Sequence, residues 1–300
     1  MMFDKIKILL FSSLLVMSCT SQKSVKSQSI VSNGAEIQLV SDIFSFTEGP
    51  AADRFGNVYF TDQPNDKIYF WDWKTNKIAE FRTGSGRANG TFFDKNDNLI
   101  TCSDEKGQIL KINKSGIAEI LTTDFNGKRL NGPNDLWLDG NNGIYFTDPL
   151  YVRDYWQDFH QEIPEKNLYY RNSEGKITKL DTFTQPNGIV GSQKLKKLYV
   201  SDIDANKTYV YDIQGDGKLT NKKLFCNLGS DGMTLDNLGN LYLTGKGVTV
   251  FNKNGEQIHH ISVPENWTAN VTFGGENFST LFITASKSVY TLKMNVSGIK

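Results

Sequence analysis

The stretch Gly56-Asn57-Val58-Tyr59-Phe60-Thr61-Asp62 opens with a turn and continues as an alternating run of residues that favour β-strands. Five further stretches resemble it: residues 97–101 (DNLIT), 143–148 (GIYFTD), 197–202 (KLYVSD), 239–244 (GNLYLT) and 280–284 (TLFIT). Measured between their first apolar residues, the six copies are 41, 45, 54, 43 and 40 residues apart. A period of about 40 to 50 residues is typical of a β-propeller, so the sequence predicts an all-β fold with six blades.

The first repeat indicates which strands each blade should contain. Residues 58–61, 67–71 and 78–81 are predicted as three strands, and a short run near residues 50–52 supplies a fourth, innermost strand. The longest interval, of 54 residues, carries an insertion at residues 150–166 that is rich in aromatic and charged residues. A connection of this length is often functional, for example as a rim over a pocket; a tolerated surface loop is the alternative.

The composition excludes several classes of protein. The chain has 300 residues, with 33 basic and 33 acidic side chains, and 22% of its residues are charged. This length suits one large domain or two modest ones, and the balanced charge gives no reason to expect a nucleic-acid partner. Three cysteines are too few for a disulfide framework, and Cys102 and Cys226 are expected to be buried thiols.

Residues 1–18 are predicted to be a lipoprotein signal peptide, with a basic start and an apolar run too short to span a bilayer. The small residues before Cys19 resemble the bacterial lipobox, despite the less usual Met17, and predict lipid attachment at Cys19; an ordinary signal peptide is the alternative. Residues 19–34 are predicted to be a flexible tether and residues 35–300 the propeller. We therefore expect a domain in a bacterial cell envelope, facing the periplasm or the surface, that meets the membrane only through its anchor.

One position in each repeat is polar where a core residue would be expected. Ten or eleven residues before each first apolar residue stand only acids and amides: Glu48, Asn89, Asn134, Asn187, Asp231 and Asn270. Each begins a predicted inner strand, and inner strands line the central channel of a propeller, so the six side chains should converge near one end of it. A structural alternative for any one of them is that Asn and Asp open strands by bonding to turn backbone.

These side chains predict a site for a hard divalent cation. Two carboxylates would balance the charge of the ion, and a set of oxygen donors suits Ca²⁺, or Mg²⁺ with stricter geometry. Zn²⁺ would normally recruit His or Cys, and none of His160, His259 and His260 begins an inner strand. Ca²⁺ is therefore the expected ion, with Mg²⁺, Zn²⁺ and Mn²⁺ as alternatives.

Five ordered motifs carry a resemblance to a known family: residues 47–50 (TEGP), 129–135 (RLNGPND), 146–149 (FTDP), 185–188 (QPNG) and 230–233 (SDGM). They resemble the gluconolactonase family, which includes regucalcin (senescence marker protein) and is similar to diisopropylfluorophosphatase. The resemblance extends over about residues 36–294 and implies a six-bladed propeller with a divalent metal in its channel. The ligand positions of the family fall on Glu48, Asn134, Asn187 and Asp231.

The resemblance also assigns substrate contacts. In regucalcin the position that matches Asn134 lies on the substrate side of the metal, so Asn134 is predicted as a ligand or a substrate contact. Asn89 and Asn270 are predicted as channel lining that binds the substrate. Regucalcin-type members have an Arg where this chain has Gly132, and a Glu within the segment that corresponds to residues 148–153 (DPLYVR). The sugar-lactone contacts of regucalcin are not preserved, which leaves the substrate more open than the metal.

The implied activity is hydrolysis of a sugar-type lactone, a small-molecule substrate, with the metal as a Lewis acid for the lactone carbonyl. Asp231 is the candidate general base; the alternative is that Asp231 is only a ligand and metal-bound water is the nucleophile. Arg153 and Tyr151, with Trp156, are candidate substrate contacts from the insertion, or exposed rim residues. Two other functions stay open: a non-catalytic propeller, plugged by calcium, that binds a ligand or protein, and a hydrolase of other esters or phosphotriesters.

Overall fold

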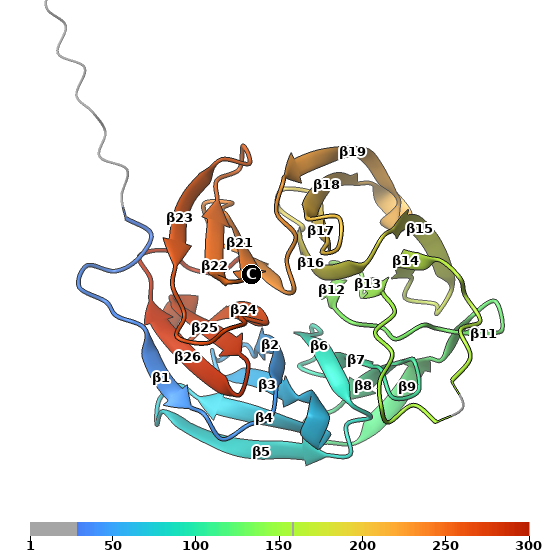
Figure 1. The fold of residues 1–300 in the computed structure, drawn as a ribbon, viewed down its shortest axis with the longest axis horizontal. Coiled ribbons are helices and arrows are strands. Elements are labelled where there is room, and N and C mark those ends of the chain that lie inside the picture. The colour runs from blue at the N-terminus through green and yellow to red at the C-terminus, as the bar shows by residue number, and fades with distance from the viewer. Residues whose placement is uncertain (1–28, 158, 300) are drawn as a thin grey trace, which may run out of the picture.

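The computed structural model describes residues 29–157 and 159–299, in which six four-stranded antiparallel sheets form a ring (Figure 1). Blade 1 contains β2 (Thr47–Ala52), β3 (Val58–Asp62), β4 (Lys67–Asp72) and β5 (Lys77–Thr83). Blade 2 contains β6 (Ala88–Phe93), β7 (Leu99–Ser103), β8 (Gln108–Ile112) and β9 (Ala118–Thr122). Blade 3 contains β12 (Leu136–Leu138), β13 (Ile144–Asp148), β14 (Lys166–Arg171) and β15 (Ile177–Phe183).

The second half of the ring repeats this arrangement. Blade 4 contains β16 (Pro186–Ser192), β17 (Lys197–Asp202), β18 (Lys207–Ile213) and β19 (Leu219–Cys226). Blade 5 contains β20 (Met233–Leu235), β21 (Leu241–Gly245), β22 (Gly247–Phe251) and β23 (Gln257–Ile261). Blade 6 contains β24 (Asn270–Gly274), β25 (Thr280–Ala285), β26 (Ser288–Lys293) and β1 (Gln38–Ser41). The predicted six-bladed propeller is confirmed.

The N-terminal strand β1 closes the ring. It pairs antiparallel with β26, with Gln38 opposite Thr291, and so becomes the outermost strand of the last blade. The end of the predicted tether also packs on this blade: Ile30 is buried, and Val31 forms a β-bridge with Met294. The rest of that segment, the predicted signal peptide and Cys19 lie outside the described residues.

Short Asp-containing turns join the first and second strands of several blades. In blade 1 the carboxylate of Asp53 accepts hydrogen bonds from the backbone N–H groups of Phe55 (2.8 Å) and Asn57 (2.9 Å). Such a side chain satisfies the turn backbone itself, which explains the Asp at the start of this turn. The same arrangement recurs at Asp94, Asp139 and Asp236.

The core lies between neighbouring sheets rather than in one central mass. The second strands are almost wholly buried, as in β13, because both faces of each sheet pack on another blade. Phe60 of blade 1 and Phe282 of blade 6, for example, have ring centroids 5.5 Å apart. The outer strands β5, β19 and β23 are largely exposed. Cys102 and Cys226 are buried free thiols, as predicted.

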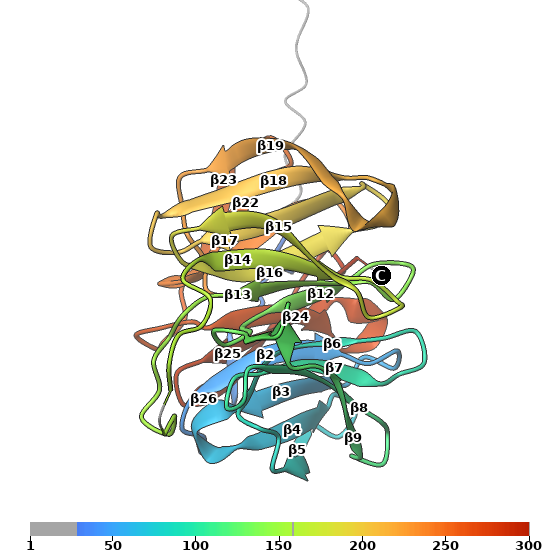
Figure 2. The same ribbon diagram turned by 90° about the vertical axis from the view of Figure 1, so that its right-hand side faces the viewer.

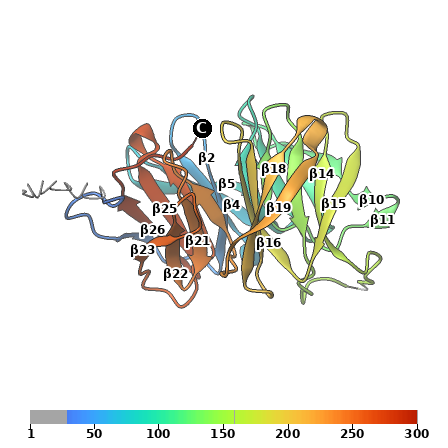
Figure 3. The ribbon, with the colours of Figure 1, turned by 90° about the horizontal axis from the view of Figure 1, so that it is seen from above.

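The ring has two distinct faces. The inner strands all run from the same face, and the long connection between β13 and β14 lies on that face, whereas the C-terminus lies on the opposite one (Figures 2 and 3). The smaller elements are the hairpin β10 (Asp124–Phe125) and β11 (Lys128–Arg129) and the 3₁₀ helices η1 (Gln63–Asn65), η2 (Gly215–Gly217) and η3 (Glu276–Phe278). Among the described residues, no helix has the length and apolar character needed to cross a membrane.

Candidate active site

The six polar residues singled out in the sequence stand at the start of the six inner strands. Five are buried, with at most 6% of their surface exposed, and the sixth, Asp231, is half-buried. They are Glu48 of β2, Asn89 of β6, Asn134 before β12, Asn187 of β16, Asp231 before β20 and Asn270 of β24. The structure therefore brings the predicted set together at one end of the channel.

Hydrogen bonds between blades link these side chains. The Asn270 amide donates to Glu48 Oε2 (3.3 Å), and the Asn187 amide donates to Asp231 Oδ1 (2.8 Å). The Asn134 carbonyl accepts the backbone N–H of Gly90, next to the blade 2 site residue (2.8 Å). Each carboxylate thus receives an amide donor from the preceding blade.

Glycine follows the site residue in four of the six repeats because the inner strands approach one another closely there. A Cβ on Gly49 would lie 1.9 Å from the carbonyl oxygen of Asn89, and the residue has a φ of +46°. A Cβ on Gly232 would lie 1.9 Å from Cγ of Asn270. Any larger residue at these positions would displace the next member of the ring, so glycine is a condition for the convergence.

The Thr-Asp pairs at the ends of the second strands hold the loops that carry the site. Asp148 accepts hydrogen bonds from the backbone N–H groups of Asn131 (3.0 Å) and Gly132 (2.8 Å), which precede Asn134. Thr147 donates to the carbonyl of Asn187 in the next blade (2.8 Å). Asp62 and Asp202 bond in the same way to the loops before β2 and β16.

The two carboxylates resist ionisation together. Burial raises the pKa of Glu48 well above its ordinary value, and the nearby charge of Asp231 raises it further. Burial also raises the pKa of Asp231 to about 6, although hydrogen bonds from Trp267 and Asn187 favour its charged form. A cation between these groups would relieve both effects, because it favours the ionised carboxylates.

The donor set fits a hard cation. The amide oxygens Asn89 Oδ1 and Asn187 Oδ1 are buried and have no hydrogen-bond partner among the described residues, which is costly unless a cation or water meets them. With the carboxylates of Glu48 and Asp231 they form an all-oxygen set of the kind that Ca²⁺ and Mg²⁺ prefer. In the described part of the chain no group of three or more His, Cys, Asp or Glu could hold a metal, so the amides are essential to any such site.

The insertion between β13 and β14 touches this set through Tyr151. Its hydroxyl oxygen accepts a hydrogen bond from Asn187 Nδ2 (2.9 Å), and the Leu150 carbonyl accepts one from Gln185 Nε2 (3.0 Å). Burial raises the pKa of Tyr151 to about 12, so the phenol stays protonated at neutral pH. Tyr151 is thus placed to contact a molecule at the channel mouth.

Arg153 is partly exposed, and its guanidinium is anchored. Its guanidinium forms an ion pair with Asp104 of the β7–β8 turn (2.9 Å), whose side chain is 3% exposed. The Tyr155 hydroxyl and the Trp156 indole also bond to Asp104, the latter through the backbone carbonyl (3.0 Å). The guanidinium carbon of Arg153 lies 5.5 Å from the centre of the Tyr151 ring. Asp104 therefore fixes the insertion over the channel.

Three residues at the site had no role in the sequence analysis. Trp267, in the loop before β24, donates its indole N–H to Asp231 Oδ2 (2.6 Å). Asp135 is buried and accepts the backbone N–H groups of Leu136 (2.9 Å) and Ile189 (3.3 Å), and burial raises its pKa to about 7. Asp104 is the third. Of the three, only Asp135 could have been found from the sequence, because it ends the motif at residues 129–135 (RLNGPND). Trp267 and Asp104 lie in loops that do not repeat.

The fold and the site together define the class of this protein: it is a six-bladed propeller with a polar site of carboxylates and amides at one end of its channel. Residues 46–287 match the family model described as SMP-30/Gluconolactonase/LRE-like region. The chain therefore belongs to the SMP-30/gluconolactonase family, and the family predicted from the sequence motifs is confirmed.

Individual relatives agree with this placement. A gluconolactonase of Zymomonas mobilis is 27% identical over 309 aligned residues, which cover 92% of this chain and 86% of that protein. The diisopropyl-fluorophosphatase of Loligo vulgaris is 27% identical over 268 residues, covering 79% and 84%. A solved structure of a gluconolactonase from Xanthomonas campestris superposes with a TM-score of 0.82 at 25% identity, covering 88% of this chain and 91% of that one. The prediction of a gluconolactonase-like enzyme is confirmed at the level of the family.

Proposed function

We propose that this protein is a metal-dependent hydrolase that opens a sugar-type lactone to the hydroxy acid. The observation that carries the proposal is the set of two carboxylates and two amide oxygens, Asn89 Oδ1 and Asn187 Oδ1, at one end of the channel; these amide oxygens have no hydrogen-bond partner in the part of the chain that the structure describes. Membership of the gluconolactonase family supports the reaction class.

Glu48, Asn187 and Asp231 would hold the cation together with Asn134, the fourth position that the family resemblance implies, and Asn89 Oδ1 would meet the ion or a water bound to it. Ca²⁺ is the ion that best suits this neutral and anionic oxygen set. A divalent cation bound there would supply Lewis-acid polarisation of the lactone carbonyl. Asn89 and Asn270 line the same end of the channel, and Tyr151 and the anchored Arg153 stand at its mouth, where they would meet the substrate.

Asp231 is the proposed general base. The indole of Trp267 and the amide of Asn187 fix its two oxygens, and its half-buried position gives it access to the channel. It would take a proton from water as the water oxygen attacks the carbonyl carbon. The proton would pass to the ring oxygen as the C–O bond of the lactone breaks. A bound cation would keep Asp231 ionised at neutral pH, as a general base must be. If Asp231 serves only as a ligand, the same residue is still required.

The first test is turnover of a lactone panel, beginning with glucono-1,5-lactone, by the purified full-length chain. Acid release is followed with and without EDTA and after addition of Ca²⁺, Mg²⁺, Zn²⁺ or Mn²⁺. We expect turnover that EDTA abolishes and one cation restores. Metal binding measured by calorimetry without turnover of any lactone would contradict the hydrolase and favour the calcium-plugged binding propeller.

The second test is Asp231→Asn, which keeps the size of the side chain but removes its charge. We expect an unchanged circular dichroism spectrum and a loss of turnover of at least about 100-fold, the scale of a lost general base. Asp216→Asn is the matched control, because Asp216 is exposed in the η2 turn at a φ of +60° that Asn tolerates. Full activity in Asp231→Asn would refute both roles of Asp231.

A second candidate reaction uses the same residues. The similarity to a diisopropyl-fluorophosphatase over 79% of this chain favours phosphotriester or phosphofluoridate hydrolysis. In this case the metal-loaded chain would release fluoride from diisopropyl fluorophosphate and leave every lactone intact, and Asp231→Asn would stop the release.

We also propose that the protein is lipid-anchored at Cys19 in a bacterial cell envelope. The proposal rests on the signal-like residues 1–18 and the lipobox-like residues before Cys19. Labelled palmitate should enter the full-length protein in bacterial cells, and Cys19→Ala should prevent the labelling and release the protein from the membrane fraction. Equal labelling of both forms would refute the anchor.

A further inference from the structure

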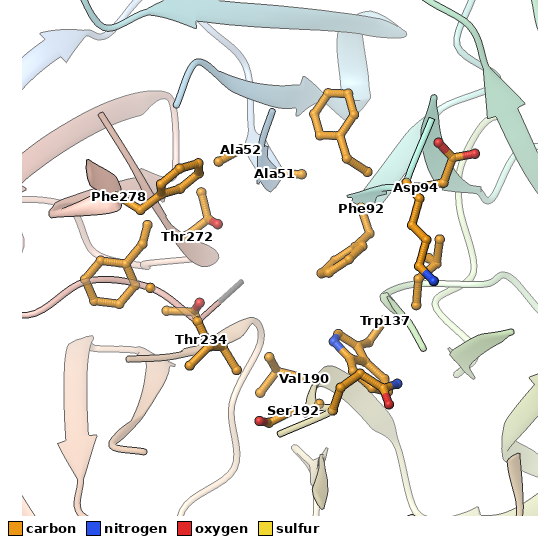
Figure 4. A pocket seen from close by; sticks show the side chains of 18 of the residues that line it. Ala51, Ala52, Phe92, Asp94, Trp137, Val190, Ser192, Thr234, Thr272 and Phe278 are labelled. Carbon is orange, nitrogen blue, oxygen red and sulfur yellow. The ribbon is translucent and has the colours of Figure 1, made fainter. Parts of the chain in front are cut away.

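A second cavity, the lower cavity, occupies the end of the channel opposite the polar site. It has a volume of about 450 Å³ and is walled by the ends of the inner strands (Figure 4). Its lining includes Ala52 of β2, Phe92 of β6, Trp137 of β12, Val190 of β16, Thr234 of β20 and Thr272 of β24. The volume falls in the range of about 300–1,000 Å³ that small-molecule sites occupy.

The aromatic wall of this cavity is fixed in place. Trp137 packs flat against the backbone of Gly191, where a Cβ would lie 2.5 Å from ring carbons of the indole. The Trp137 ring also lies 5.7 Å from Tyr145, centre to centre. The side chain is 4% exposed, so it cannot swing freely to fill the cavity. The space is therefore preformed, as in most small-molecule sites.

The charged residues at the rim are already engaged. Asp53, Asp94 and Asp139 accept backbone hydrogen bonds within their own turns. Arg54 forms an ion pair with Asp97, and Lys95 donates to the Gly140 carbonyl. These bonds hold the charged groups at the rim, and the walls formed by Phe92, Trp137 and Val190 are uncharged, so the interior of the cavity favours an uncharged ligand.

The remaining polar groups are few and neutral. Trp137 directs its indole nitrogen toward the open space, and no acceptor for it lies within hydrogen-bonding distance among residues 29–157 and 159–299 (Figure 4). The hydroxyl-bearing side chains of Thr234 and Thr272 line the opposite side. The indole donor and a few neutral polar side chains among apolar walls match a molecule that is mostly apolar and carries a hydrogen-bond acceptor.

The channel between the two sites is narrow. A space of about 50 Å³ lies between them, lined by residues that include Asp135, Leu136, Met233 and Val271. A ring compound that fills the lower cavity cannot pass through a space of this size, so it would enter and leave on the face that carries the C-terminus.

From these observations we propose that the lower cavity is a binding site for an uncharged, largely apolar ring compound whose acceptor bonds to the indole N–H of Trp137. The site is distinct from the polar end of the channel and does not depend on the proposed lactone hydrolysis.

The probe for the test is prodan, an uncharged naphthalene with a ketone acceptor whose emission moves to the blue in apolar surroundings. Titrated with the full-length protein, it should bind with one-to-one stoichiometry, and its binding should quench tryptophan emission by energy transfer. Trp137→Phe keeps an aromatic wall but removes the donor, and we expect about fivefold weaker binding, the usual effect of one neutral hydrogen bond.

Filling the cavity supplies the decisive comparison. Thr234→Phe places a ring in the open space and should weaken prodan binding at least tenfold, and Ala52→Phe should do the same from the other side if the first variant does not fold. Thr220→Phe adds the same ring to an exposed position of β19 and should leave binding unchanged. The proposal is overturned if the wild type shows no saturable binding, or if binding survives both filling variants.

Discussion

The substitution Gly232→Ala tests how the six polar side chains are brought together. The new Cβ would lie 1.9 Å from Cγ of Asn270, whereas ordinary contact starts at 3.4 Å, so the Asn270 amide must move by about 1.5 Å. That movement breaks the bond from Asn270 to Glu48 (3.3 Å) and the bond that Asn270 accepts from Val271 (2.8 Å). Because the pKa of Glu48 is raised well above its ordinary value in the metal-free chain, both bonds count as neutral ones of about 1 kcal/mol each, so the expected destabilisation is about 2 kcal/mol.

The assay is equilibrium unfolding in guanidinium chloride, monitored by circular dichroism and tryptophan fluorescence in the presence of EDTA. The matched control is Gly215→Ala, where a Cβ meets nothing within 4 Å, and its effect should stay within about 1 kcal/mol.

A double-mutant cycle isolates the clash from other effects of the added methyl group. In an Asn270→Ala background the displaced amide is absent, so Gly232→Ala should cost less than about 1 kcal/mol. If Gly232→Ala has the same cost in both backgrounds, or no greater cost than Gly215→Ala, the close approach does not hold Asn270 in place and the reasoning is wrong.

Two further predictions follow from the anchored insertion and from the buried carboxylates. Asp104→Asn removes the charge that pairs with Arg153 and should raise the KM for the substrate about tenfold with a smaller change in kcat. Asp181→Asn, which breaks an ion pair between the outer strands of blades 3 and 4, should change neither constant. Steady-state kinetics measure both variants, and equal effects would contradict the positioning role of Asp104. The folded-state pKa of Asp231 is about 6 and that of Glu48 is also raised, so at these two groups the metal-free folded chain binds more protons than the unfolded chain, and their contribution to stability falls as pH rises toward 7. Because Ca²⁺ binds the ionised carboxylates, its stabilisation of the chain should grow over the same range. Thermal unfolding with Ca²⁺ and with EDTA at pH 5, 6 and 7 measures this difference, and a Ca²⁺ effect independent of pH would refute the prediction.

The sequence predicts the repeat and the polar position in each copy because both recur at fixed spacing. The alternation in residues 56–62 and in its five copies indicates strands, the period indicates a propeller, and the six copies predict six blades. Glu48 and Asp231 could be found because they occupy equivalent positions in different repeats. A periodic pattern of this kind survives in one dimension, so no contact information was needed to detect it.

Only the tertiary structure reveals the contacts that have no counterpart in other repeats. Trp267 reaches Asp231 and Asp104 reaches Arg153 across 36 and 49 residues of sequence, from loops that follow no period. Ring closure by β1 joins residues at opposite ends of the chain. The second cavity likewise depends on side chains that all six inner strands bring to one place. The repeat determines where each strand begins, but which side chains meet across the channel depends on how the six sheets pack into the ring.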